Sequence, residues 1–290
     1  RKPYKSRLRS TTKLGSTSIV VEPSLKWRYG DEIVLTTTSY LYNETEKFSI
    51  SSYNNVTGEI ILDSEIKYVH YGAMEVSPIL NNPTYPLREP DERAEVIMIS
   101  RNIKISGSAD WGCNVISLTQ ELSGYSFHGK MNMTNVEFNN CGQIDTEYSA
   151  LQFMNSNSPN FSNINYNSFN GLGYSAIKIQ NSTNLNFNGN TMYDIKKYGF
   201  NLLDSSNITI TDNIVSYLKK RPFTTQLKSN DIIDMTACFA ICHDSKSKNC
   251  NGIKLKENTC AGSEYFGFIM QAYDCEDDLR SEEIGYNTAY

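Results

Sequence analysis

Short alternations of apolar and polar residues, separated by Asn, Ser, Gly and Asp, fill residues 176–215. Residues 176–192 match residues 199–215 at an offset of 23, which aligns Leu185 with Ile208 and Phe187 with Ile210. Alternation over a few residues predicts a half-buried strand, and the separating residues are turn formers. Three short strands per repeat are typical of one coil of a parallel β-helix. Stacked coils would place residues 23 apart in one apolar column, with neighbouring strands about 4.8 Å apart.

The same pattern continues on both sides of this stretch. Asn167 precedes Asn190 by 23 residues, and Asn258 follows Asn213 by 45, which we interpret as two coils on with an insertion between. The step from the asparagine to the next strand also recurs, since Ile177, Phe200 and Phe268 each lie 10 residues after Asn167, Asn190 and Asn258. We therefore predict an all-β chain wound as a right-handed single-stranded parallel β-helix of the pectin-lyase type. Residues 1–93 are expected to be a β-rich segment continuous with this solenoid. Residues 94–290 are expected to form the coils, with an insertion near 219–250 in which residues 235–245 contain a short helical or bulged turn.

Composition and charge limit the partners and the cellular location that we expect for this chain. The 290 residues carry a net charge of −5, so nucleic acid is a poor partner. No apolar run is long enough to cross a membrane, the chain starts with Arg1, and residues 284–290 resemble the opening of another coil. We expect a fragment of a larger protein whose targeting signal and anchor lie elsewhere.

Seven cysteines raise the question of disulfides. Disulfides around the insertion, with Cys238, Cys242, Cys250 and Cys275 as candidates, imply an oxidising compartment. Cys260 falls at a core position of the repeat, so a buried thiol is the alternative there. A metal site is disfavoured because no cysteine or histidine spacing fits a known zinc motif.

Six N-x-S/T sequons occur, a number that chance alone explains in a chain so rich in Asn, Ser and Thr. Asn43 and Asn55 lie in expected loops and are the better candidates for glycosylation if the protein is secreted.

The repeat also predicts which side chains face outward, where β-helix enzymes that act on polysaccharides bring carboxylates together. These positions are Gln152, Lys178 and Asn201 in the first strand, Asn186, Thr209 and Lys254 in the second, and Ser168, Thr191 and Thr259 in the third. None is acidic, and Asp194, Asp204 and Asp212 fall at turns. The histidines His70, His128 and His243 are scattered, and His70 is expected to be structural. The acidic residues 274–278 favour a solvated loop over a calcium site, because their spacing fits no known loop. We predict no catalytic residue, no cofactor and no metal.

Several segments together resemble one family, and the resemblance runs from about residue 12 to the end of the chain. They include residues 30–40 (GDEIVLTTTSY), 68–72 (YVHYG), 93–96 (RAEV), 135–138 (NVEF), 148–155 (YSALQFMN), 212–215 (DNIV) and 237–242 (ACFAIC). In this order they are similar to the framework of fibrocystin and fibrocystin-L, where it follows a domain named for eight conserved glycines.

The resemblance implies a large extracellular, single-span membrane protein of cilia or other surface protrusions, without an established enzymatic activity. Relatives of this architecture include a group that depolymerises hyaluronan and carries a His-x-His pair where this chain has Leu151, Gln152 and Phe153. The favoured hypothesis is a non-catalytic scaffold on the extracellular face of the plasma or ciliary membrane, contacting other surface proteins or matrix glycans. The alternative is a carbohydrate-active β-helix that binds a polysaccharide or depolymerises it, as a hyaluronidase does.

Overall fold

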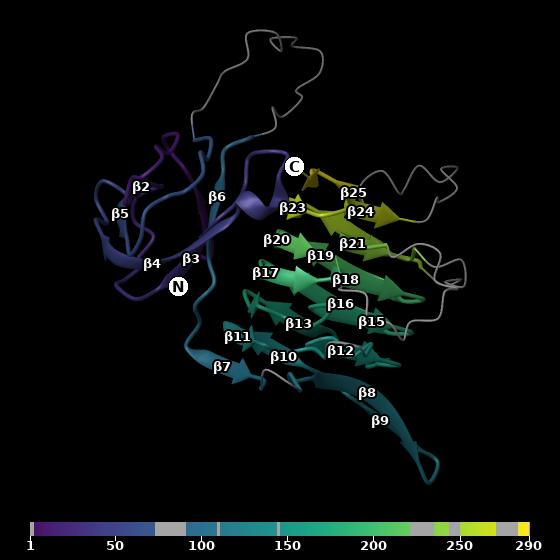
Figure 1. Cartoon of the computed structure of the whole chain (residues 1–290). Helices are drawn as coiled ribbons and strands as arrows, with labels where there is room; N and C mark the ends of the chain where they lie inside the picture. Colours follow the sequence, from purple (N-terminus) through teal and green to yellow (C-terminus); the bar gives the residue numbers. More distant parts are fainter. Residues whose placement is uncertain are drawn as a thin grey trace, which may run out of the picture. The chain divides into compact units, whose positions relative to one another are not determined.

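The computed structural model describes residues 3–72, 91–108, 111–143, 146–220, 235–243, 250–270 and 284–289 (Figure 1). Within these ranges the chain is β-structure apart from turns, loops and one short 3-10 helix, η1 (Tyr42–Glu44). The chain divides into two compact units between Met98 and Ile99. Each unit has a hydrophobic core of its own.

The N-terminal unit is a six-stranded antiparallel sheet with the strand order β1-β6-β3-β4-β5-β2. Its strands are β1 (Lys5–Arg7), β2 (Ser18–Val20), β3 (Glu32–Leu35), β4 (Glu46–Tyr53), β5 (Glu59–Leu62) and β6 (Glu95–Met98). A bridge between Leu8 and Val21, and a 2.8 Å hydrogen bond from the Arg9 amide to the Val20 carbonyl, join the two edges. The sheet thus closes on itself around a core that includes Trp27, which removes exposed strand edges.

Strand β6 differs from the expectation that the coils begin at residue 94. Glu95–Met98 pairs antiparallel with β1 and β3. All four of its residues are buried. A fully buried strand has no alternation, so its pattern does not tell which sheet it joins.

The C-terminal unit consists of three sheets of stacked strands (Figure 1). The first sheet contains β8 (Val115–Leu122), β9 (Tyr125–His128), β12 (Leu151–Met154), β15 (Ile177–Gln180), β18 (Tyr198–Leu203), β21 (Ala237–Ile241) and β24 (Phe266–Met270). The second contains β10 (Asn132–Thr134), β13 (Ser162–Asn165), β16 (Thr183–Asn188), β19 (Ser206–Thr211), β22 (Ile253–Lys256) and β25 (Ile284–Gly285). The third contains β7 (Ile103–Ser106), β11 (Val136–Asn139), β14 (Ser168–Asn170), β17 (Thr191–Lys196), β20 (Ile214–Lys219), β23 (Thr259–Ser263) and β26 (Thr288–Ala289).

The chain visits the first, second and third sheets once per coil, which confirms the predicted single-stranded parallel β-helix. Leu185 is the parallel partner of Ile208, and Phe187 is the partner of Ile210, as the offset of 23 predicts. All of these side chains are buried. Aromatic rings continue the core along the solenoid axis: Phe200 stacks on Phe239 at 5.4 Å between ring centroids.

Strand β21 corrects the expectation of a helical or bulged turn at residues 235–245. Ala237–Ile241 is a regular strand between β18 and β24, with Phe239 paired to Phe200 and to Phe268. Its five residues are buried without alternation, and the insertion before it breaks the offset of 23. Both effects hide the strand from a search by period. Residues 221–234 and 244–249 lie outside the described residues.

A ladder of asparagines runs along the turn between the second and third sheets. Its members are Asn167, Asn190, Asn213, Asn258 and Asn287, of which the first four are fully buried. The backbone N–H of Asn190 donates to Asn213 Oδ1 at 2.9 Å, and its side-chain Nδ2 donates to the same oxygen at 2.9 Å. Asn213 bonds directly to Asn258, so the 45 residues between them make one coil with an insertion and not the two coils expected. The ladder satisfies buried backbone groups that a tight turn would otherwise leave without partners.

Candidate interaction surface

The outer face of the first sheet is more buried than the sequence suggests. Gln152, Lys178 and Asn201 are parallel partners in one column, yet they are only 3%, 8% and 7% exposed. Lys178 Nζ lies 3.1 Å from a carboxylate oxygen of Glu147, and His243 Nε2 lies 3.2 Å from Asn201 Oδ1. The Gln152 Nε2 atom is buried and has no hydrogen-bond partner among the residues that the structure describes. This column offers amide, ammonium and imidazole groups. The Glu147 carboxylate beside it is paired with Lys178.

The outer face of the third sheet holds a carboxylate that the sequence inventory missed. Glu137 on β11 is the parallel partner of Ser168, so it occupies an outward position, and it is fully buried. Its Oε2 accepts a 2.7 Å hydrogen bond from the Arg101 backbone N–H, and its Oε1 forms a 3.2 Å ion pair with Lys104. The Asn170 side chain donates to the Ile99 carbonyl at 3.3 Å. The segment around residues 99–101 therefore covers this face, which explains why an outward carboxylate is buried.

The outer face of the second sheet is polar and partly open, and we call it the amide face. It has two columns of stacked side chains, Asn132, Asn163, Asn186, Thr209 and Lys254 in one and Thr134, Asn165, Asn188, Thr211 and Lys256 in the other. Ten of ten are partly or fully exposed.

Hydrogen bonds run between the rungs of the amide face. Asn186 Nδ2 donates to Asn163 Oδ1 at 3.1 Å, and Asn188 Nδ2 donates to Thr211 Oγ1 at 2.8 Å. A side-chain amide has two N–H donors and two acceptor lone pairs, so one bond to the next rung does not use its full capacity. The result is a repeating set of donors and acceptors about 4.8 Å apart along the solenoid.

Two neighbouring strands of the third sheet, β17 and β20, combine tyrosine with lysine, and Asp194 lies in β17 and not at a turn as expected. Lys219 Nζ lies 2.6 Å from Asp194 Oδ1 and 4.2 Å from the ring centre of Tyr217. Burial lowers the pKa of Lys219, but the hydrogen bond and charge of Asp194 outweigh burial and raise it overall. Burial, followed by the charge of Asp194 and the neighbouring Tyr217, raises the pKa of Tyr193. Lysine and tyrosine are therefore held in their ordinary protonated forms.

Disulfides occur at three of the four candidate cysteines. Cys238 is bonded to Cys260, and Cys242 is bonded to Cys250. Cys275 lies outside the described residues. Cys260 is buried, as its repeat position predicts, but it is paired and not a free thiol. The first bond links β21 of the first sheet to β23 of the third across the interior of the coil.

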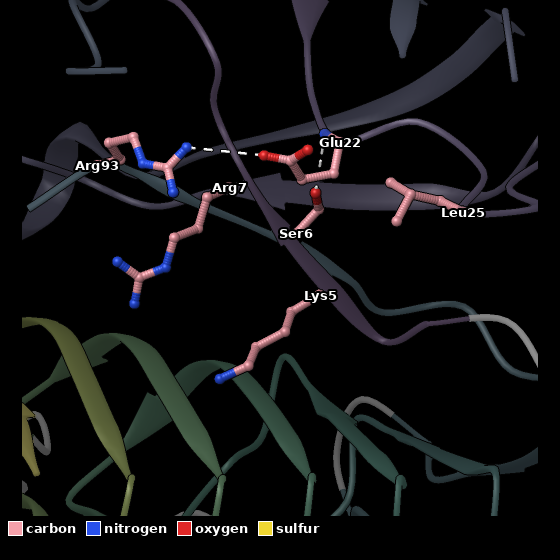
Figure 2. Close-up of a pocket in the computed structure, with 6 residues that line it drawn as sticks. All are labelled: Lys5, Ser6, Arg7, Glu22, Leu25 and Arg93. Atoms are coloured by element: carbon pink, nitrogen blue, oxygen red, sulfur yellow. Dashed lines mark hydrogen bonds and ion pairs between the residues drawn. The ribbon is translucent and has the colours of Figure 1, made fainter. Parts of the chain in front are cut away.

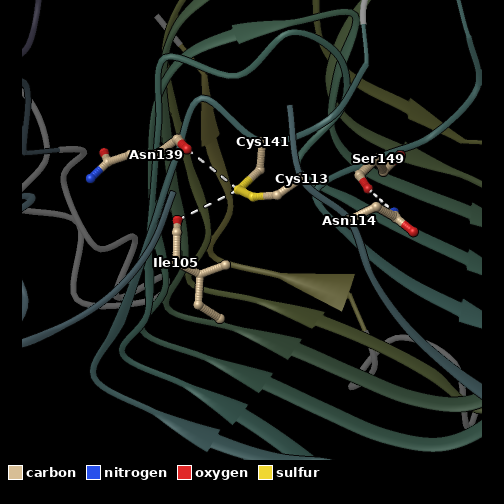
Figure 3. The surroundings of a disulfide bond; sticks show 6 residues. All are labelled: Ile105, Cys113, Asn114, Asn139, Cys141 and Ser149. Atoms are coloured by element: carbon tan, nitrogen blue, oxygen red, sulfur yellow. Dashed lines mark hydrogen bonds between the residues drawn. A yellow bond between two sulfur atoms is a disulfide. The ribbon is translucent and has the colours of Figure 1, made fainter. Parts of the chain in front are cut away.

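A third disulfide, between Cys113 and Cys141, was not predicted (Figure 3). The two cysteines are 28 residues apart, which matches no offset of the repeat. Cys141 Sγ lies 3.6 Å from the Ile105 carbonyl oxygen and 3.5 Å from that of Asn139. This bond ties two turns together near the start of the solenoid, where the sequence period is absent.

The N-terminal unit contains a cavity of about 290 Å³ (Figure 2). Its lining consists of Lys5, Ser6, Arg7, Glu22, Leu25 and Arg93. Arg7 pairs with Glu95 at 2.9 Å, and Arg93 pairs with Asp91 at 2.8 Å. Burial raises the pKa of Asp91, but the hydrogen bond from Arg93 and the charge of Arg7 outweigh it and hold the pKa at about 2. Because the cations are matched by carboxylates, the cluster stabilises the unit and is a poor site for an anion.

His70 has the structural role that its position predicts. It is fully buried, with Nδ1 2.9 Å from the Thr36 carbonyl oxygen and Nε2 3.0 Å from Glu46 Oε2. The two glycosylation candidates are both exposed: Asn43 lies in η1, and Asn55 lies in the turn between β4 and β5. Their modification stays a prediction.

The described parts of the chain have neither a cluster of metal ligands nor a membrane-spanning helix. No group of three His, Cys, Asp or Glu side chains is close enough there to hold a metal ion. The acidic residues 274–278 lie outside the described ranges. In those ranges no helix has both the length and the apolar character to span a bilayer.

These features define a class: a single-stranded parallel β-helix preceded by a closed antiparallel unit, with a polar outer face and internal disulfides. The chain is a distant relative of fibrocystin and fibrocystin-L, as its motifs predict. It is 25% identical to fibrocystin of Canis lupus familiaris over 283 residues, which cover 94% of this chain and 6% of that protein. It is 33% identical to fibrocystin-L of Homo sapiens over 167 residues, which cover 52% of this chain and 4% of that protein.

More remote similarities complete the comparison. A G8 domain-containing protein of Dictyostelium discoideum is 24% identical over 240 residues, covering 70% of this chain and 15% of its own length. No family model matches the chain. Among solved structures, the tailspike protein gp49 of Pseudomonas phage LKA1 has a TM-score of 0.24 at 6% identity, covering 92% of this chain and 47% of the tailspike. The catalytic domain of a GH87 alpha-1,3-glucanase has a TM-score of 0.26 at 11% identity, covering 91% of this chain and 66% of its own. At such TM-scores these similarities add nothing to the fold, which stands on the strand register.

Proposed function

We propose that this chain is a non-catalytic β-helix segment of a larger fibrocystin-like protein on the extracellular face of the plasma or ciliary membrane. In this role it is a rigid scaffold, and its amide face is the interaction surface. The observation that carries the proposal is the continuous stacking of coils. Apolar columns run through β13, β16, β19 and β22, and the asparagine ladder runs without a break along the turn that follows these strands. Because every coil is bonded to the next along its length, bending requires many contacts to open together.

The disulfides support the extracellular assignment. Bonds such as Cys242–Cys250 form and persist in oxidising compartments, and they are rare in the cytosol. The similarity to fibrocystin and fibrocystin-L supports the extracellular assignment as well. The matches span only 6% of fibrocystin and 4% of fibrocystin-L, so the partners proposed below rest on this chain's own surface.

Extracellular proteins or matrix glycans are the proposed partners of the amide face. A surface of amides and hydroxyls suits a partner rich in hydroxyl and amide groups, since each asparagine or threonine of the face offers a donor and an acceptor. This observation also favours the second candidate function, polysaccharide binding. Depolymerisation is the weaker form of that candidate. Glycoside hydrolysis needs two carboxylates that flank the glycosidic bond. The Glu137 carboxylate faces outward, but it is already bonded to the Arg101 backbone N–H and paired with Lys104.

Two measurements on the disulfide-intact chain test the proposal. Hydrogen exchange followed by mass spectrometry should show strong protection of β13, β16 and β19, with protection similar in successive coils. Incubation with a panel of neutral and anionic polysaccharides, followed by size-exclusion chromatography, should leave the polymer length unchanged.

Two outcomes would contradict the proposal. Rapid exchange throughout β16 and β19 would exclude a rigid scaffold. Shortening of any polymer, abolished by Lys178→Ala but not by the matched exposed variant Lys130→Ala, would show that the first outer column is an active site.

A further inference from the structure

The first sheet ends in a hairpin that extends away from the stacked strands, formed by β8 and β9 (Figure 1). The two strands are antiparallel, with Gln120 opposite Phe127 and Leu122 opposite Tyr125. The turn between them is two residues long, and both Ser123 and Gly124 have positive φ, at 51° and 82°. Such a turn matches the twist of the flanking strands, so the hairpin geometry is well defined.

The hairpin is amphipathic, and near its tip both its apolar and its polar side are exposed. Residues two apart in a strand, and residues directly opposite across a pair, share a face. One face therefore carries Ile116, Leu118, Gln120, Leu122, Tyr125 and Phe127. The other face carries Ser117, Thr119, Glu121, Ser126 and His128. We call the first of these the apolar hairpin face.

The apolar hairpin face is too large to be incidental. Ile116 is 43% exposed, Leu118 46%, Leu122 57%, Tyr125 72% and Phe127 57%. At about 200 Å² for a large apolar side chain, these fractions amount to roughly 550 Å². Single exposed apolar residues are ordinary, whereas an apolar patch of this size is at the upper end of what a monomer exposes and is often functional.

The open edge of the hairpin argues against a lipid bilayer as that molecule. Strand β9 is the last strand of the first sheet in the described part of the chain, with β8 on one side. One row of its backbone N–H and C=O groups therefore faces no strand. In hydrocarbon such groups cannot bond to water, and each costs several kcal/mol.

A second copy of the same chain fits the face better. The face carries no charged side chain, so two copies meeting across a two-fold axis oppose no like charges. Gln120 lies among the apolar residues, and an amide is both donor and acceptor, so two Gln120 side chains can bond to each other. Two such faces together bury roughly 1,100 Å², just above the roughly 1,000 Å² that a specific interface needs.

We propose that the apolar hairpin face is a homodimer interface, in which two copies of this chain pack β8 and β9 face to face. An area at the low end for specific interfaces predicts a weak, reversible dimer. The inference is independent of the scaffold function, because it concerns the hairpin and not the amide face.

Sedimentation velocity of the disulfide-intact chain over a concentration series tests the interface. We expect a reversible monomer–dimer equilibrium, weakened at least tenfold by the double variant Leu118→Ser and Phe127→Ser. Gln120→Lys should weaken it too, because it brings two like charges together while leaving the apolar residues in place. The matched double variant Thr119→Ser and Glu121→Gln changes the opposite face and should dimerise as the parent does. All substituted side chains except Thr119 are exposed, so thermal unfolding should be unchanged and serves as the folding control.

Three results would overturn the proposal. One is a chain that stays monomeric at every concentration. Another is a dimer that the apolar and the opposite-face variants weaken equally. The third is a monomer that binds phosphatidylcholine–phosphatidylserine vesicles and loses that binding in the Leu118→Ser and Phe127→Ser variant, which would assign the face to lipid.

Discussion

Replacing Asn190 with alanine should show how much of the stability of the solenoid resides in the asparagine ladder. The Asn190 side chain is fully buried and bonded on both sides. Its Oδ1 accepts the Asn167 backbone N–H at 2.9 Å. Its Nδ2 donates to Asn213 Oδ1 at 2.9 Å and to the Ile164 carbonyl at 2.8 Å.

The expected cost follows from these contacts. Asn190→Ala leaves the buried Asn167 N–H without an acceptor, which costs about 1–3 kcal/mol. Losing the two bonds donated by Nδ2 adds about 0.5–1 kcal/mol each, because both acceptors can keep other donors. The sum is a loss of about 2–5 kcal/mol in the free energy of unfolding. Because neighbouring rungs share these bonds, Asn190→Ala and Asn213→Ala combined should cost less than the sum of the two single variants.

The assay is urea unfolding followed by far-UV circular dichroism, with hydrogen exchange at the Asn167 amide as the local readout. The matched control is Asn186→Ala, which removes an asparagine of the same coil from the partly exposed amide face. Water can replace its bond to Asn163, so we expect a change within about 0.5 kcal/mol. If Asn190→Ala costs no more than Asn186→Ala, or if the Asn167 amide stays protected, the ladder is not a stabilising element.

Three further predictions concern other parts of the chain. The double variant Cys238→Ser and Cys260→Ser should lower stability by about 2–4 kcal/mol and remove one cross-linked peptide pair from non-reducing mass spectrometry; unchanged urea unfolding would contradict it. The pKa of Asp91 is lowered from 3.8 to about 2 in the folded state, so its contribution is present above pH 4 and is lost as the pH falls from about 4 to 2. Asp91→Asn should remove that part of the acid titration of stability, and an identical titration of the two proteins would refute the assignment. At Gly199 an added Cβ would lie 2.5 Å from the Cys238 carbonyl oxygen, so Gly199→Ala should destabilise by about 1–3 kcal/mol in thermal or urea unfolding. The control is Gly285→Ala, where an added Cβ meets nothing within 4 Å, and an equal loss in both variants would contradict the prediction.

The sequence predicts the solenoid where its coils are regular. Leu185 and Ile208 become vertical neighbours because identical coil lengths keep the same turn residues at the same positions, so period and register report the same geometry. The buried asparagines follow for the same reason. Where an insertion intervenes, as before Phe239, the coil persists but its period is lost. A fully buried strand then has neither alternation nor offset to reveal it.

Burial of the outer columns could not be predicted, because a repeat says which way a side chain points but not what lies over it. Glu137 points outward, yet a segment from another part of the chain, at residues 99–101, covers it and supplies its hydrogen bond. Such coverage depends on contacts between segments that share no period. The pairing of Cys113 with Cys141 is hidden for the same reason, since it joins two irregular turns.

The strand register of the hairpin decides which of its residues face outward and are open to a partner. Val115 pairs with Leu151, whose side chain is in the core, so the alternate residue Ile116 must face outward. From Ile116 onward the large apolar residues fall on this outward phase, and β9 places Phe127 on the same side. A strand chosen only to complete the first sheet would put polar residues there, as Gln152 does on the next coil. On this hairpin the outward residues are apolar, whereas the outward residues Gln152 and Lys178 of the next coils are polar. An interface requires such an apolar outward face, and a solenoid that ends without a partner does not.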